Sequence, residues 1–86
     1  MLKLEMEMKL DIPFATAREA EIAFDALRVE VEPARSRVKR RLELSGAVLT
    51  ANFVADSARS LRVSVNGFLE HVVLVTQTLS QFGPPL

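Results

Sequence analysis

The sequence predicts an α+β fold: a three-stranded antiparallel sheet with two helices packed on one face, in the order β-α-β-β-α. Residues 2–12 and both halves of residues 37–55 place apolar side chains at every second position, which is typical of strands with one buried face. Residues 17–27 and 58–82 instead repeat apolar side chains at helical spacing. Covering one face of the sheet with both helices is the simplest arrangement that closes a core.

The length and composition favour a single small domain spanning residues 1–86. A core of this size is thin, so we expect a partner to add stability. Cysteine is absent, which excludes disulfides and thiolate metal sites. The first ten residues alternate apolar with charged side chains, unlike a signal peptide, and no uncharged apolar run approaches the roughly 20 residues of a membrane span. We therefore expect a soluble intracellular protein.

The first strand and the first helix have clear boundaries. In residues 2–12 the apolar side chains alternate with charged ones, and Pro13 ends the run. Thr16 can then cap a helix, with Glu19 three residues later able to bond back in a capping box. The helix is predicted over residues 17–27, and its apolar face consists of Ala20, Ala23, Phe24 and Leu27.

Residues 37–55 are predicted to form a β-hairpin. Ser45 and Gly46 would make its two-residue turn, because glycine accepts a positive φ. This register pairs Leu44 with Ala47, Leu42 with Leu49, and Val38 with Phe53, so that all six side chains share one face. Arg40 falls on the same apolar face. Either it lies at the rim with its aliphatic stem buried, or the strand is bulged at that point.

Residues 58–82 are predicted to form one long helix despite many β-branched residues. Strand-like alternation covers only residues 61–65, whereas a 4-3 apolar spacing lasts for three heptads, at Leu61, Val65, Phe68, Val72, Val75, Leu79 and Phe82. Asp56 or Ser57 can cap its start, and Gly83 with Pro84 stops its end. The helix would be roughly 37 Å long at ~1.5 Å per residue.

The sequence offers little for catalysis. His71, the only histidine, follows Glu70, and adjacent residues of a helix do not face each other. No nucleophile and base stand at a recognisable spacing, no glycine-rich loop is suited to phosphate, and no cluster of histidine and carboxylate residues suggests a metal. We therefore expect no enzymatic activity, no cofactor and no metal.

A basic run is the most suggestive charged feature. The net charge is zero, but residues 31–55 carry five basic and two acidic residues, and all five basic ones lie at Arg35, Arg37, Lys39, Arg40 and Arg41. In a strand, Arg37, Lys39 and Arg41 share one face at intervals of roughly 6–7 Å, with Thr50 and Asn52 beside them on the partner strand. Such a stripe can follow a phosphate backbone. The alternative is a solvated face or a charged edge strand that prevents aggregation.

A glycine on the long helix raises the second functional question. Val63, Gly67 and Leu74 lie opposite the helix's apolar face, and Asn66 and Glu70 flank them. Glycine inside a helix costs roughly 1 kcal/mol relative to alanine. A glycine between apolar residues on an otherwise wet face suggests close approach by another backbone. The alternative is a tolerated glycine beside two scattered apolar side chains.

The chain resembles a known family over residues 12–85. The stretches that carry the resemblance are IPFATAREAEIAF, VKRRLELSGAVLTANFVA and, most specifically, LRVSVNGFLE with the later FGPP. They are similar to the Pcc-type small subunit of the KEOPS (EKC) complex, to which the L antigen family of animals belongs. Arg59, Arg62, Ser64 and Asn66 match the signature of the family's second helix.

The resemblance implies a function and a set of partners. KEOPS makes threonylcarbamoyl-adenosine at position 37 of tRNA, and a larger, ATPase-like subunit performs the transfer. The small subunit is non-catalytic: it docks on that subunit, pairs with itself or a related small subunit, and helps to bind tRNA, in the cytoplasm and the nucleus. The candidate tRNA contacts are then Arg37, Lys39, Arg41, Arg59 and Arg62. The candidate docking residues are Val63, Asn66, Gly67, Glu70 and Leu74.

Two other functions fit the same residues. A β-α-β-β-α order with a basic hairpin also resembles KH-like domains, which would make the chain a free-standing RNA-binding module. The absence of a GxxG loop argues against that function. A purely structural dimerisation protein with an inert basic stripe is the other alternative.

Overall fold

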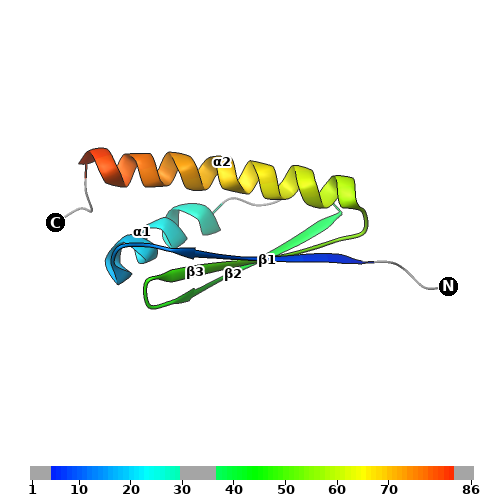
Figure 1. Cartoon of the computed structure of the whole chain (residues 1–86), viewed down its shortest axis with the longest axis horizontal. Helices are drawn as coiled ribbons and strands as arrows, with labels where there is room; N and C mark the ends of the chain where they lie inside the picture. The colour runs from blue at the N-terminus through cyan, green and yellow to red at the C-terminus, as the bar shows by residue number, and fades with distance from the viewer. Residues whose placement is uncertain (1–4, 30–36, 83–86) are drawn as a thin grey trace.

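The predicted order of elements is confirmed. A computed structural model describes residues 5–29 and 37–82 of the chain. The elements are β1 (Met6–Pro13), α1 (Ala17–Arg28), β2 (Val38–Ser45), β3 (Val48–Ala55) and α2 (Ala58–Phe82) (Figure 1). Leu2, Leu4, Arg35, Gly83 and Pro84, which entered the predictions above, lie outside the described residues.

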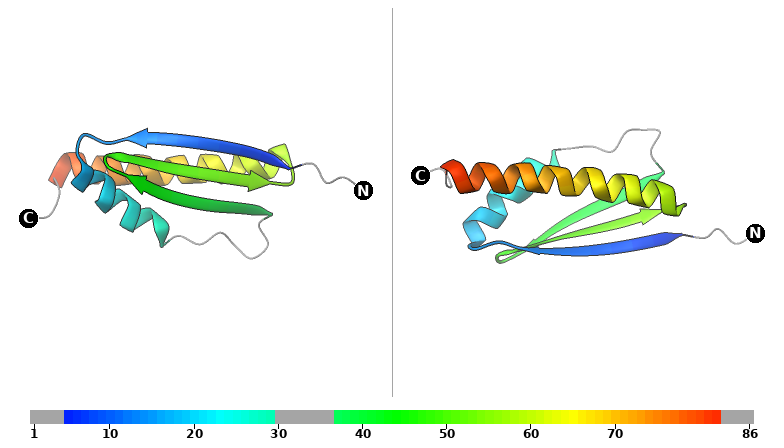
Figure 2. Two further views of the ribbon diagram at one scale, coloured as in Figure 1. Left: turned by 90° about the horizontal axis from the view of Figure 1, so that it is seen from below. Right: turned by 45° about the horizontal axis from the view of Figure 1, so that its top comes forward.

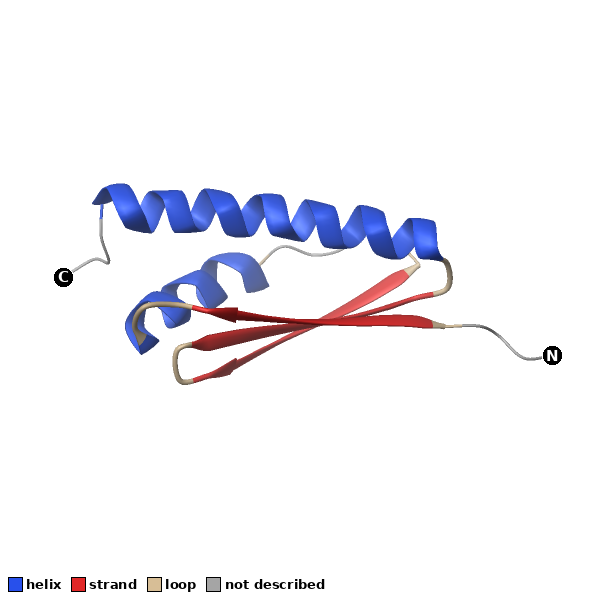
Figure 3. Ribbon diagram, in the orientation of Figure 1, coloured by secondary structure: helices blue, strands red, loops and turns tan. Residues whose placement is uncertain are grey.

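The sheet is antiparallel with the strand order β1-β3-β2, so that β3 is central and β1 and β2 form the edges. Both helices lie on the same side of it (Figure 3). In the view from below, α1 lies on the β2 side of the sheet, and α2 runs behind the strands from one end of the sheet to the other (Figure 2, left). The sheet therefore has an inner face under the helices and an outer face that neither described helix covers.

The hairpin register differs from the prediction by two residues. Gly46 and Ala47 form the turn, and Ser45 pairs with Val48. The inner-face pairs are accordingly Leu44 with Leu49, Leu42 with Ala51, Arg40 with Phe53, and Val38 with Ala55. Gly46 has a φ of 58°, and a positive φ at the first central residue alone is the pattern of a type II′ turn. A shift of two residues keeps every side chain on its predicted face.

The inner face and the two helices enclose the core. Phe53, Leu27 and Leu49 are its largest fully buried side chains. Small residues on α1, Ala20 and Ala23, are completely buried and allow that helix to approach the sheet closely. On α2 the predicted apolar face is confirmed from Leu61 to Leu79: Leu61, Val65, Phe68 and Val72 are buried, while Val75 and Leu79 are partly buried. The side chain of Phe82, the last member of the predicted face, lies outside the described ones.

Arg40 lies on the inner face of an unbulged strand. It is half-buried, and its register neighbour on β3 is Phe53. Its Nη2 atom donates a hydrogen bond to the carbonyl oxygen of Leu27 at 3.2 Å, near the end of α1. Its guanidinium lies over the ring of Phe68, 5.6 Å from the centroid. Of the two alternatives from the sequence, a regular register with the arginine stem partly buried is therefore the correct one.

Both helices begin at side-chain caps. The Thr16 hydroxyl accepts a hydrogen bond from the Glu19 backbone N–H at 3.1 Å, as predicted. At α2 the cap is Ser57, whose hydroxyl accepts from the backbone N–H of Ser60 at 3.1 Å. Asp56, the other candidate cap, forms an ion pair with Arg37 instead.

Candidate nucleic-acid and partner surfaces

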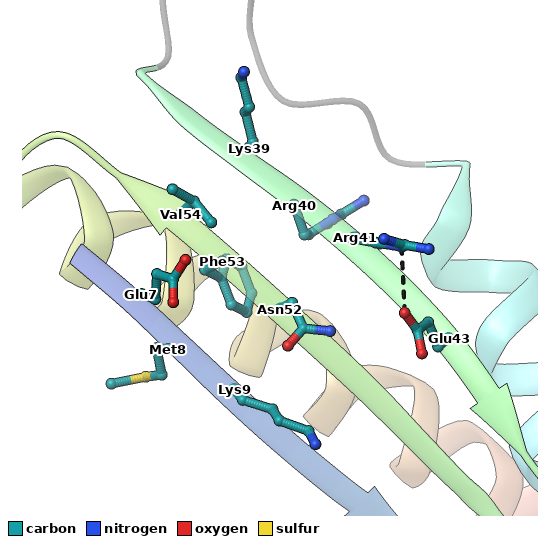
Figure 4. A pocket seen from close by; sticks show the side chains of 10 residues that line it. All are labelled: Glu7, Met8, Lys9, Lys39, Arg40, Arg41, Glu43, Asn52, Phe53 and Val54. Carbon is teal, nitrogen blue, oxygen red and sulfur yellow. Dashed lines mark ion pairs between the residues drawn. The ribbon is translucent and has the colours of Figure 1, made fainter. Parts of the chain in front are cut away.

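The outer face of the sheet carries an open groove. Strand alternation turns the odd-numbered side chains of β1 and β2, and the even-numbered ones of β3, away from the helices. The groove has a volume of about 670 Å³, and its lining includes Glu7, Lys9, Lys39, Arg41, Glu43 and Asn52 (Figure 4). Met8, Phe53 and Val54 complete the apolar part of the lining, while its charged and amide side chains are suited to a charged or hydrogen-bonding ligand.

Strand register arranges these side chains in rows across the sheet. Asn52 pairs with Lys9 on one side and with Arg41 on the other, which creates a cation–amide–cation row. The next row runs from Asp11 through Thr50 to Glu43 and carries the opposite charge. Within that row the Thr50 hydroxyl donates a hydrogen bond to Asp11 at 2.8 Å.

The predicted basic stripe lies along β2, but acidic groups accompany it. Lys39 and Arg41 lie on the outer face, and Arg37 precedes the strand. Arg41 forms an ion pair with Glu43 at 3.2 Å, and Arg37 forms one with Asp56 at 3.2 Å. Ion pairs as exposed as Arg41–Glu43 contribute little free energy, about 0–1 kcal/mol, and are easily exchanged for another anion. An anion can therefore still bind the stripe, although the paired carboxylates make it less cationic than the β2 sequence alone suggested.

The five candidate tRNA contacts fall into two groups. Arg59 and Arg62 are exposed residues in the first two turns of α2, on the helical side of the sheet. Lys39 and Arg41 point from the opposite face. Arg37 connects the two groups, because its partner Asp56 lies just before α2 begins. A single nucleic acid that touched all five would have to pass around this end of the sheet.

The candidate docking residues share the exposed side of α2. Val63 is 66% exposed and Leu74 is 57% exposed, and Asn66 and Glu70 are exposed beside them. A Cβ atom added at Gly67 would meet nothing within 4 Å. The fold of this chain therefore does not itself require glycine at this position.

A second apolar surface was not singled out from the sequence. Met6 and Met8 point to the inner face of the edge strand β1, yet they are 42% and 41% exposed. Phe68 contacts Arg40 of β2, and the opposite flank of α2 carries the exposed Leu69 and Val73. Alternation in residues 2–12 does predict that Met6 and Met8 face inward. Only the strand order reveals that they lie at an uncovered edge, and we call these four residues the β1 margin.

Two classes of site find no support in the described part of the chain. Within residues 5–29 and 37–82, no three His, Asp or Glu side chains are placed to hold a metal ion together. The described helices include none with the length and hydropathy needed to span a bilayer. His71 is an exposed residue of α2.

Comparisons with known proteins identify relatives over most of the chain. Mouse EKC/KEOPS complex subunit Lage3 is 43% identical over 77 residues, and human LAGE3 is 42% identical over the same length. Each alignment covers 90% of this chain but 52% and 54% of the relative, so the chain spans about half the length of these relatives. An EKC/KEOPS complex subunit of Schizosaccharomyces pombe is 28% identical over 83 residues, with 96% of this chain and 94% of the relative covered.

The fold has a solved counterpart as well. A chain in a crystal structure of a binary complex of Gon7 and Pcc1 superimposes with a TM-score of 0.80 and 23% sequence identity, covering 87% of this chain and 93% of that one. At this identity the likeness concerns the fold alone. Residues 7–80 match the family described as "Transcription factor Pcc1". The family match and the close mammalian relatives agree with the fold, and the chain belongs to the Pcc1 family.

Proposed function

We propose that this protein is a non-catalytic subunit of a KEOPS (EKC) complex. It docks on the catalytic threonylcarbamoyltransferase subunit and helps to bind tRNA for threonylcarbamoyl-adenosine modification at position 37. The mouse and human relatives, at 43% and 42% identity, are subunits of such a complex, which supports membership. We place its action in the cytoplasm and the nucleus.

The exposed side of α2 is the observation that carries the docking part of this proposal. Val63 and Leu74 place apolar area in water on a side of the helix that packs on nothing within the described chain. Gly67 lies between them and has open space where a side chain would be. A helix of the catalytic subunit can approach most closely where a glycine lacks a side chain, and burial of the two apolar residues would favour the contact.

The β1 margin supports pairing with a second small subunit. Among the described residues, β1 and β2 each have a strand on one side only, so their outer edges leave backbone groups unpaired. However, α1 packs against β2, and three consecutive basic residues charge that strand from Lys39 to Arg41. The β1 edge instead exposes Met6 and Met8, and α2 exposes Leu69 and Val73. A second copy, or a related small protein, could extend the sheet there and cover the margin. One solved neighbour in fold is a chain of a binary complex of Gon7 and Pcc1.

Co-purification with the catalytic subunit tests the docking surface. Gly67→Leu should leave the fold intact and abolish co-purification, because the new side chain blocks close approach. Ala26→Leu, which adds the same side chain at an exposed position on α1, is the matched control and should bind normally. Native affinity in the Gly67→Leu variant would show that this side of α2 is not the docking surface.

Measurements of tRNA affinity distinguish the proposed function from the two alternatives. A dimerisation protein with an inert basic stripe should leave tRNA affinity unchanged when added to the large subunit. A KH-like module should bind RNA equally well alone and in the assembly. The proposed accessory subunit should instead raise the affinity of the assembled complex.

A further inference from the structure

We propose that the row Lys9–Asn52–Arg41 on the outer face of the sheet binds the phosphodiester backbone of RNA, in competition with Glu43. The inference rests on the proposed function, because tRNA is the nucleic acid of that function. It adds Lys9 and Asn52 as phosphate contacts and gives Glu43 an opposing role. None of these three roles follows from the basic run in the sequence.

The geometry of the row suits a phosphate group. Adjacent strands are about 4.8 Å apart, so the three residues span about 10 Å across β1, β3 and β2. The close-up of the groove shows the Asn52 amide between Arg41 and Lys9 (Figure 4). An ammonium, an amide NH₂ and a guanidinium all donate hydrogen bonds, and phosphate oxygens accept them. The half-buried Asn52 side chain makes no hydrogen bond with another described residue, so its amide is available.

The row has three acidic neighbours: Asp11 is engaged, Glu43 is replaceable, and Glu7 lies in the adjacent row, across Val54 from Lys39. The Asp11 carboxylate accepts a hydrogen bond from the Thr50 hydroxyl, so it is engaged within the row Asp11–Thr50–Glu43. Glu43 occupies Arg41 at 3.2 Å, but the two side chains are 54% and 79% exposed. A phosphate that binds Arg41 bidentately would displace this carboxylate at little cost. Glu43 therefore weakens binding without preventing it.

A backbone fits the groove better than a lone phosphate or a base. Lys39 precedes Arg41 by two residues on β2, at an interval of about 6–7 Å, and can take a second phosphate. The outward-facing residues of the three described strands include no aromatic ring, since Phe53 is fully buried on the inner face. Without a stacking platform, the contact should ignore base sequence and depend strongly on salt.

The test is a titration of the full chain with fluorescent tRNA and with oligouridine at several salt concentrations. Lys9→Gln should weaken binding and make the slope of log affinity against log salt shallower by about 0.7, the contribution of one phosphate contact on a single strand. Asn52→Thr should weaken binding with the slope unchanged, because the substitution removes no charge. Glu43→Gln should strengthen binding.

The matched control is Arg28→Gln, which removes an exposed cation from an ion pair on α1. It should bind both RNAs as the wild type does. If Arg28→Gln lowered the affinity as much as Lys9→Gln does, the effect would arise from net charge alone, and the proposal would be overturned. An unchanged affinity in Lys9→Gln or Glu43→Gln would overturn it as well. Displacement of the RNA by ATP at equal phosphate concentration would indicate a single-phosphate site and likewise contradict a backbone surface.

Failure of this inference is distinguishable from failure of the proposed function. The row lies on the opposite layer from the exposed side of α2, so the groove variants should co-purify with the catalytic subunit normally. Normal docking with unchanged RNA binding in these variants refutes the row alone. If the wild type does not dock on the catalytic subunit, the proposed function is refuted. The titration of the isolated chain still shows whether the row Lys9–Asn52–Arg41 binds RNA.

Discussion

The guanidinium of Arg40 lies over the ring of Phe68, 5.6 Å from its centroid, and so joins the edge strand β2 to the long helix α2. The same guanidinium donates to the Leu27 carbonyl oxygen, which connects α1 to the same cluster. Phe68 in turn meets Phe53 of β3 edge-to-face, with centroids 5.5 Å apart and an interplanar angle of 71°. One arginine of the basic run is therefore part of the scaffold.

We predict that Arg40→Met destabilises the fold by about 1–3 kcal/mol. Methionine replaces the apolar stem but provides neither the charged hydrogen bond nor the cation over the ring. Denaturant unfolding at fixed protein concentration measures the change in the free energy of unfolding. Arg41→Met is the control, because the adjacent arginine lies on the outer face in an exposed ion pair and should change stability by less than about 1 kcal/mol. Equal destabilisation in the two variants would contradict a structural role for Arg40.

The two described glycines should respond to alanine with opposite signs. Gly46 has a φ of 58°, where an L-residue is strained by about 1–2 kcal/mol, so Gly46→Ala should destabilise the hairpin. Gly67 is helical with open space around it, so Gly67→Ala should stabilise the isolated chain by roughly 0.8–1 kcal/mol. Thermal unfolding of both variants checks the signs. A destabilised Gly67→Ala variant would mean that the glycine serves the chain's own fold.

We predict that the β1 margin mediates self-association. Met8→Lys should dissociate the dimer, because it places a charge in the apolar surface at the sheet edge. Light scattering at micromolar concentration gives the mass of each variant. Leu44→Lys is the control, since Leu44 is 36% exposed on the inner face of the opposite edge strand. A monomeric wild type would refute the homodimer, and a mixing experiment with a related small subunit would then test the heterodimer.

The basic stripe should contribute to tRNA affinity in the assembled complex. Replacing Arg37, Lys39 and Arg41 together with serine should weaken tRNA binding. The salt dependence should become shallower by about 0.7–0.9 for each phosphate group that the variant no longer neutralises. Filter binding of the reconstituted complex at several salt concentrations provides the measurement. Unchanged affinity and slope would assign the stripe to solubility alone.

Much of the local structure was determined by the sequence. The 4-3 spacing from Leu61 predicted α2 with the boundaries observed, Ala58–Phe82, because the spacing persists over three heptads while strand-like alternation ends after five residues. Thr16 and Glu19 predicted the start of α1. The inward and outward faces of all three strands also followed from alternation, since a strand has a period of two. These features depend on neighbours in the chain, which the sequence states directly.

Tertiary structure decided the hairpin register, the strand order and the groove. Alternation cannot distinguish registers that differ by two residues, because both put the same side chains on the same face, and the backbone of Gly46 selected the observed one. The order β1-β3-β2 then brought Lys9 beside Asn52 and left Met6 and Met8 uncovered at an edge. Such pairs join residues that are far apart in the chain, and their pairing depends on how the sheet and helices close around the buried core.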